Sequence, residues 1–186
     1  MDATTLDGGF ADIATDSARA FRVIMRAMAR PGEIGAVEPM QAPAPLSAAA
    51  ATLLLTLCDP ETPVFLGPRH DSTALRHWLA FHTGAPVVSA AEAMFAVGDW
   101  GDLPLDDFAI GTPEYPDRSA TLIVEMPELT NDGATLRGPG IDGTRALSLP
   151  DHDTFATNAA RFPLGLDFYF TCDTRLAGLP RSTRIS

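Results

Sequence analysis

The chain has 186 residues, of which 46% are apolar and 20% charged, so we expect one compact domain spanning 1–186. Its 24 acidic residues outnumber its 13 basic ones, and the formal net charge of −11 disfavours nucleic-acid binding. All 13 basic residues are arginine. The absence of lysine excludes a Schiff base, a pyridoxal phosphate aldimine and a Walker A phosphate loop within this chain.

The ends and cysteines of the chain indicate a cytoplasmic protein. Residues 1–7 lack the basic region and apolar stretch of a secretory signal. The longest apolar run, residues 46–58, is shorter than the about 20 residues that a membrane span needs. Cys58 and Cys172 lie far apart within apolar patterns, which favours two separate thiols over a disulfide framework.

The first predicted helix covers residues 17–30, with Asp16 as its N-cap and Pro31 after its end. At 3.6 residues per turn its arginines share a narrow stripe opposite the apolar face. A solvated face paired with surface carboxylates is the favoured interpretation, and a docking surface for an anionic ligand or an acidic partner subunit is the alternative. The stripe consists of Arg19, Arg22, Arg26 and Arg30.

Helices and short strands alternate along the rest of the chain. This alternation predicts an α/β fold of three layers, with helices on both faces of a sheet whose strands are parallel or mixed. The predicted helices are 47–58 capped by Ser47, 72–83 capped by Asp71 or Ser72, and 154–162 capped by Asp153; the predicted strands are 63–66, 85–88, 94–97, 119–126, 134–137, 145–149 and 166–172.

His82 is a candidate ligand-binding residue, because it lies on the apolar side of the helix predicted at 72–83. A partly buried histidine that complements the helix dipole is the favoured interpretation, and contact with a ligand is the alternative. Four aspartates in 98–107 do not have the spacing of a calcium loop, so no metal site is predicted.

The segment Gly138–Gly143 has the letters of a dinucleotide-binding loop, G-x-G-x-x-G. No helix of sufficient length follows, so we interpret the segment as a tight turn. Such a turn can still present backbone N–H groups to an anion. The candidate anion site consists of Arg137, Gly138, Gly140, Arg181 and Arg184. No catalytic residue is predicted.

Several segments, taken in order, resemble the PhnH family of the carbon–phosphorus lyase system for phosphonate breakdown. The resemblance extends over essentially the whole chain. Ser182 stands where the family more often has threonine. The segments are 21–32, 57–59 with 62–63, 81–86, 111–112 with 115–122, 136–141, Asn158, 162–167 and 179–184.

The resemblance implies an α/β fold with a mixed sheet, similar to the large domain of pyridoxal-phosphate-dependent transferases but without the cofactor. It implies a homodimer within a core complex of PhnG, PhnI and PhnJ subunits. That complex transfers the ribose triphosphate of ATP onto a phosphonate and then cleaves the carbon–phosphorus bond. The family has no assigned catalytic residue. The nucleosidase-type chemistry is ascribed to PhnI, and the radical iron–sulfur chemistry is ascribed to PhnJ.

Three hypotheses follow from the residues and the resemblance. The leading one is a non-catalytic but required subunit of the phosphonate assembly, without a cofactor. The second is an autonomous enzyme on a phosphonate or nucleotide that uses His82 and an arginine-lined pocket. The third is a regulator that binds a small molecule.

Overall fold

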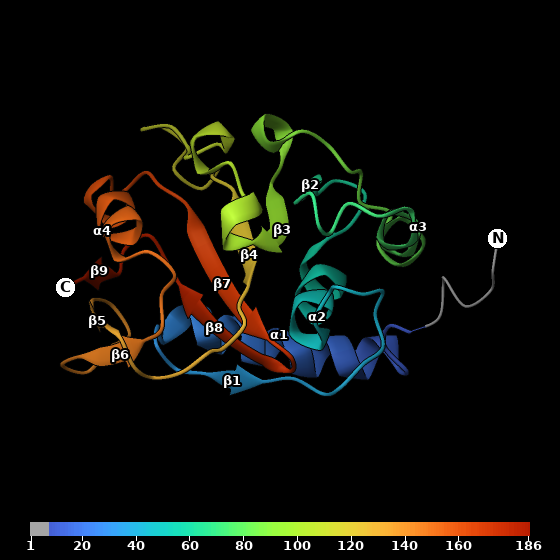
Figure 1. Cartoon of the computed structure of the whole chain (residues 1–186), viewed down its shortest axis with the longest axis horizontal. Helices are drawn as coiled ribbons and strands as arrows, with labels where there is room; N and C mark the ends of the chain where they lie inside the picture. Colours follow the sequence, from blue (N-terminus) through green and yellow to red (C-terminus); the bar gives the residue numbers. More distant parts are fainter. Residues whose placement is uncertain (1–7) are drawn as a thin grey trace.

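The computed structural model describes residues 8–186 as an α/β structure of four α-helices, a six-stranded sheet and a three-stranded sheet (Figure 1). Residues 1–7, on which the expectation of no secretory signal rests, lie outside the described part. The helices are α1 (Ile13–Ala29), α2 (Ala48–Leu57), α3 (Thr73–His82) and α4 (His152–Ala160). The strands are β1 (Gly35–Ala36), β2 (Val64–Leu66), β3 (Phe95–Asp99), β4 (Thr121–Glu125), β5 (Ala134–Arg137), β6 (Arg145–Leu147), β7 (Asp167–Cys172), β8 (Arg175–Leu179) and β9 (Arg184–Ile185).

The main sheet is mixed, with the strand order β1-β8-β7-β4-β3-β2. The four strands β2, β3, β4 and β7 are parallel, whereas β8 and β1 continue the sheet in antiparallel pairing. β7 and β8 form a hairpin that turns at Asp173, which has a positive φ of 53°. The sheet therefore combines a parallel part of four strands, as in other α/β folds, with an antiparallel edge of two.

Helices α1, α2 and α3 contribute to the hydrophobic core on one face of the main sheet. Ile24 of α1, Leu53 of α2 and Trp78 of α3 are each 0% exposed in this core. α1 lies very close to β8, because a Cβ atom on Gly178 would stand 2.7 Å from the carbonyl oxygen of Ala27. The glycine thus permits a helix-to-sheet approach that a side chain would block.

The opposite face is covered by α4, by short 3₁₀ turns and by the small antiparallel sheet of β6, β5 and β9, whereas we expected helices alone. Phe155 of α4 packs edge-on against Phe168 and Phe170 of β7, with ring centroids 4.9 and 5.5 Å apart. The small sheet adds Leu136 and Leu147 to the same core.

β7 is buried on both faces. Phe168 and Phe170 lie on one face, and Tyr169 and Thr171 lie under the helices on the other. The Tyr169 hydroxyl donates a hydrogen bond to the Ile24 carbonyl oxygen at 3.3 Å. Burial raises the pKa of the Tyr169 phenol, so this hydroxyl keeps its proton and remains a donor.

The carboxylate of Glu125, at the end of β4, joins α2 to the sheet. It accepts hydrogen bonds from the Ser47 backbone N–H at 2.7 Å and from the Thr171 hydroxyl at 2.9 Å. Burial raises the pKa of Glu125, and these hydrogen bonds oppose that shift. Ser47 is also the N-cap of α2, as predicted.

Two predicted helix starts are wrong. α1 begins at Ile13 rather than 17, because Asp12 and not Asp16 accepts the capping hydrogen bond, from the Thr15 N–H. α4 begins at His152, because Asp151 rather than Asp153 caps it. In both cases an earlier aspartate satisfies the free N–H groups of the first turn.

Other predictions have mixed outcomes. The segment 85–88 forms only one bridge, between Val64 and Val87, rather than a strand. Gly138–Gly143 is a turn between β5 and β6 and opens no helix, as predicted. Cys58 and Cys172 are unbonded thiols, and burial raises the pKa of Cys58 to about 12. No helix within 8–186 is both long and apolar enough to cross a membrane.

Candidate functional site

The outer face of α1 carries the predicted arginine stripe and is the first candidate site. All four arginines are exposed, while Ile24 on the opposite side of the helix is fully buried. Arg22 and Arg30 form no ion pair with any of residues 8–186. Two positive charges of the stripe are therefore held in no ion pair by the part of the chain that the structure describes.

The other two stripe arginines have carboxylate partners. Arg19 Nη1 lies 3.9 Å from the Asp16 carboxylate, and the Arg19 side chain is 67% exposed. Arg26 donates two hydrogen bonds to Glu33, from Nε at 2.8 Å and from Nη2 at 3.2 Å. These bonds hold the pKa of the Glu33 carboxyl below its usual value. The interpretation of a carboxylate-paired face thus accounts for half of the stripe.

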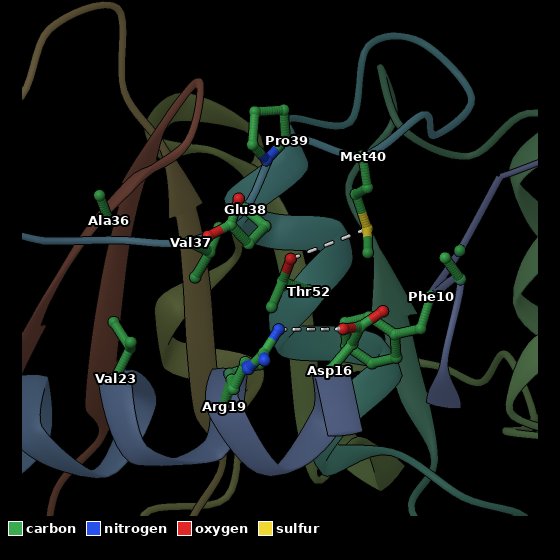
Figure 2. A pocket seen from close by; sticks show the side chains of 13 residues that line it. Phe10, Asp16, Arg19, Val23, Ala36, Val37, Glu38, Pro39, Met40 and Thr52 are labelled. Atoms are coloured by element: carbon green, nitrogen blue, oxygen red, sulfur yellow. Dashed lines mark hydrogen bonds and ion pairs between the residues drawn. The ribbon is translucent and has the colours of Figure 1, made fainter. Parts of the chain in front are cut away.

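A cavity of about 320 Å³ lies beside this stripe, between α1, the segment from β1 to α2, and residues 9–11 (Figure 2). Its walls are mainly apolar, and its polar groups are few. The Thr52 hydroxyl in its wall donates to the Ala48 carbonyl oxygen at 2.7 Å and lies 3.7 Å from Met40 Sδ. The apolar lining residues are Gly9, Phe10, Ala11, Ala20, Val23, Ala36, Val37, Pro39 and Met40.

The charged residues of this cavity are Asp16, Arg19 and Glu38 (Figure 2). Arg19 belongs to both the stripe and the cavity wall, so the two features are continuous. The lining includes neither histidine nor cysteine. A mainly apolar cavity of this size suits an apolar group.

His82 lies at the end of α3 and is half-buried, as its position on the apolar side predicted. Its ring packs against Trp78, at 4.9 Å between centroids, and edge-on against Phe81, at 5.0 Å. Gly9, a lining residue of the cavity, abuts the same ring, since a Cβ atom built there would lie 2.8 Å from His82 Cε1. His82 therefore supports the segment that forms one wall of the cavity.

The side chain of Arg181 is used within the fold. Its Nη2 donates to Asp167 at 2.8 Å, and its Nη1 donates to the carbonyl oxygens of Pro116 and Gly165. The Arg181 and Asp167 side chains are only 15% and 19% exposed. Arg181 thus holds the start of β7 against the loop that contains Pro116.

Arg137 and Arg184 are neighbours, because they are paired residues of β5 and β9. Both are exposed and form no ion pair with the described residues. Gly138 lies against the Ser182 backbone, with its built Cβ 3.1 Å from that carbonyl oxygen. Gly140 instead packs on Ala29 at the end of α1. The predicted anion site is thus divided, and Arg137, Gly138 and Arg184 stay together.

A buried histidine that is not among the predicted site residues lies beyond the end of β2. His70 is 1% exposed, and both its ring nitrogens lack a hydrogen-bond partner within residues 8–186. Burial lowers the pKa of His70, Arg69 lowers it further, and Asp99 and Asp102 oppose the shift. In the sequence, His70 lies between two charged residues and resembles a solvated turn, so no local pattern marks it as buried.

Comparisons with known proteins give one family. A family model described as bacterial phosphonate metabolism protein (PhnH) matches residues 8–186. A protein of Rhizobium meliloti (strain 1021), described as alpha-D-ribose 1-methylphosphonate 5-triphosphate synthase subunit PhnH, is 42% identical over 188 residues. That alignment covers 96% of this chain and 94% of the relative.

Proposed function

The chain belongs to the PhnH family of bacterial phosphonate metabolism proteins, and we propose that it is a non-catalytic but required subunit of a complex for phosphonate catabolism. The observation that carries this proposal is the near full-length similarity to a subunit of ribose 1-methylphosphonate 5-triphosphate synthase. In this role the chain supports the formation of ribose methylphosphonate triphosphate from ATP and a phosphonate, ahead of cleavage by the carbon–phosphorus lyase.

The residues of the chain support a non-catalytic role. Without lysine it cannot form an aldimine, and two separate thiols are too few to hold an iron–sulfur cluster. The cavity beside α1 is lined mainly by apolar side chains. The proposed partners are PhnG, PhnI and PhnJ subunits together with a second copy of this chain, and the proposed compartment is the cytoplasm.

We also propose that the fold is a cofactor-free relative of the large domain of pyridoxal-phosphate-dependent transferases. The mixed sheet with a parallel core between two covering layers supports this relation. The missing lysine then means that the architecture operates here without the cofactor's chemistry.

Copurification and a synthase assay test the proposed function. The chain, tagged and expressed with its co-encoded subunits, is expected to coelute with them. The assembly is expected to consume ATP and phosphonate only when this chain is present, whereas the isolated chain is inert. A chain that never coelutes, or an assembly that is fully active without it, contradicts the proposal.

The alternative of an autonomous phosphonate- or nucleotide-binding protein now rests on Arg137 and Arg184, since Arg181 is engaged within the fold. Calorimetry of the isolated chain with ATP, adenine and a phosphonate separates the two functions. Heat of binding that Arg137→Ala abolishes, or turnover that His82→Ala abolishes, favours the alternative. A flat titration with an inert chain removes it.

A further inference from the structure

We propose that the outer face of α1 and the cavity beside it form a docking surface for an acidic segment of a different subunit, which inserts one bulky apolar side chain into the cavity. The inference rests on the proposed role as a complex subunit and adds the place and chemistry of the contact. It is carried by the continuity of the arginine stripe with an apolar cavity.

Helix α1 places the arginine stripe between one wall of the cavity and a pair of exposed apolar side chains. At 100° per residue the four stripe arginines fall within about 80° of the helix circumference, on the exposed side of α1. Val23, a cavity-lining residue, lies on one flank of the stripe. Phe21 and Met25 lie on the other flank and are 47% and 50% exposed. Large apolar side chains that flank a charged row in this way are typical of protein interfaces rather than of a merely solvated face.

The cavity fits a single anchoring side chain. Its volume of about 320 Å³ lies near the lower end of the range of binding pockets. Interfaces gain most of their binding energy from a few bulky side chains buried in such pockets. The ion pair of Arg19 and Asp16, 3.9 Å long, lies in the cavity wall. Arg19 is therefore placed to turn toward a partner's carboxylate as the cavity fills.

Charge indicates the nature of the partner. The chain as a whole carries −11, so its surface repels other acidic proteins except where positive charge is concentrated. Arg22 and Arg30 form no ion pair with residues 8–186 and are exposed. An acidic segment laid along α1 would pair with both without breaking any ion pair of residues 8–186.

A second copy of the chain fits this face poorly. In a two-fold symmetric dimer the same patch meets itself, so the arginine stripes of the two copies would face each other across the dimer interface. Like charges opposed in an interface disfavour that pairing. The stripe therefore selects a different chain whose contacting surface is acidic.

Two variants test the two halves of the surface separately, with a matched control. Arg22→Glu reverses an exposed charge that forms no ion pair with residues 8–186, and Val37→Phe, at a half-buried wall residue that packs on the α1 side of the sheet, puts a larger side chain into the cavity. Arg161→Glu makes the same charge change at an exposed position beyond α4. Binding of each purified chain to the assembly of co-encoded subunits is titrated at low and high salt, and thermal unfolding checks that each variant folds.

Arg22→Glu and Val37→Phe are each expected to weaken binding about tenfold or more, while Arg161→Glu binds like wild type. Higher salt should weaken wild-type binding and reduce the difference in affinity between wild type and Arg22→Glu, while the loss of affinity in Val37→Phe persists. Wild-type affinity in both variants overturns this surface and leaves complex membership intact. Self-association that Arg22→Glu abolishes also overturns it, in favour of a second copy. If the wild type does not bind at all, the proposed function itself fails.

Discussion

The carbonyl oxygen of Ala29, in the last turn of α1, lies 2.0 Å from the position that a Cβ atom would occupy on Gly140. The turn between β5 and β6 is therefore pressed directly against the end of the helix that carries the arginine stripe. Gly140 also has a positive φ of 80°. Both the backbone conformation and the contact require glycine at this position.

Gly140→Ala is expected to lower the free energy of unfolding by at least about 3 kcal/mol. The Ala29 carbonyl oxygen must move to make room for the new Cβ atom, and alanine must also hold a positive φ that strains its backbone. Gly143→Ala is the matched control. Gly143 has a similar φ of 71° but no atom within 4 Å of its built Cβ, so its cost is about 1 kcal/mol. Urea unfolding measures both values. Equal losses in the two variants would show that the contact with Ala29 contributes nothing.

Replacement of Arg181 tests whether this residue is structural. Arg181→Met leaves the half-buried Asp167 carboxylate without its bidentate partner, so unfolding should become easier by about 3 kcal/mol. Arg181→Lys should recover only part of this loss, since lysine cannot form the two parallel hydrogen bonds. Arg184→Met, at an exposed position, should stay within about 0.5 kcal/mol of wild type in the same denaturation experiment. A fully stable Arg181→Met chain would return Arg181 to the candidate ligand-binding residues.

Asn158 fixes the start of β7 through a pair of hydrogen bonds. Its Nδ2 donates to the Leu166 carbonyl oxygen at 2.9 Å, and its Oδ1 accepts from the Leu166 N–H at 2.8 Å. Asn158→Ala leaves both backbone groups buried without a partner, at an expected cost of about 2–3 kcal/mol. Thr157→Ala, at an exposed position of the same helix, should change stability by less than about 0.5 kcal/mol. Thermal unfolding of both variants checks this difference, and equal midpoints would refute it.

Elements with a local signature were predictable from the sequence. α2 and α3 each have a serine cap, Ser47 and Ser72, followed by an apolar pattern, and both caps are confirmed. β8 was missed, because its short segment Arg175–Leu179 forms a strand only by pairing with β7 and contains Gly178, which disfavours a strand locally. Its stability comes from tertiary contacts that no local window contains.

The candidate site was only half predictable for the same reason. The arginine stripe is a local pattern along α1, and its exposure is confirmed. The cavity combines side chains from four separated segments, such as Phe10, Val23, Met40 and Thr52, so it exists only after folding. The predicted anion site combined the turn after Arg137 with the C-terminal arginines, and the fold does bring Arg137 and Arg184 together. It removes Arg181, which turns inward to Asp167, because no local pattern reveals that contact.

His70 is expected to make the stability of the protein depend on pH. Its ring is 1% exposed, and burial lowers its pKa in the folded state, whereas an unfolded histidine titrates near pH 6.5. Below about pH 6.5 the unfolded chain therefore binds a proton that the folded chain resists. The free energy of unfolding should accordingly fall as the pH drops through this range. Nearby Asp99 and Asp102 reduce the effect without reversing its sign.

The measurement is urea unfolding at several pH values between about 7 and 5, where this histidine changes its charge in the unfolded chain. His70→Leu should flatten the decline toward acid pH, because the variant has no proton to take up at this position. His77→Leu, which removes an exposed histidine of α3, is the control for losing one imidazole from the chain. A His70→Leu profile as steep as that of wild type would mean that other groups cause the acid sensitivity. A decline toward acid pH that His70→Leu flattens and His77→Leu leaves unchanged would assign the acid sensitivity to the buried His70 ring beyond β2.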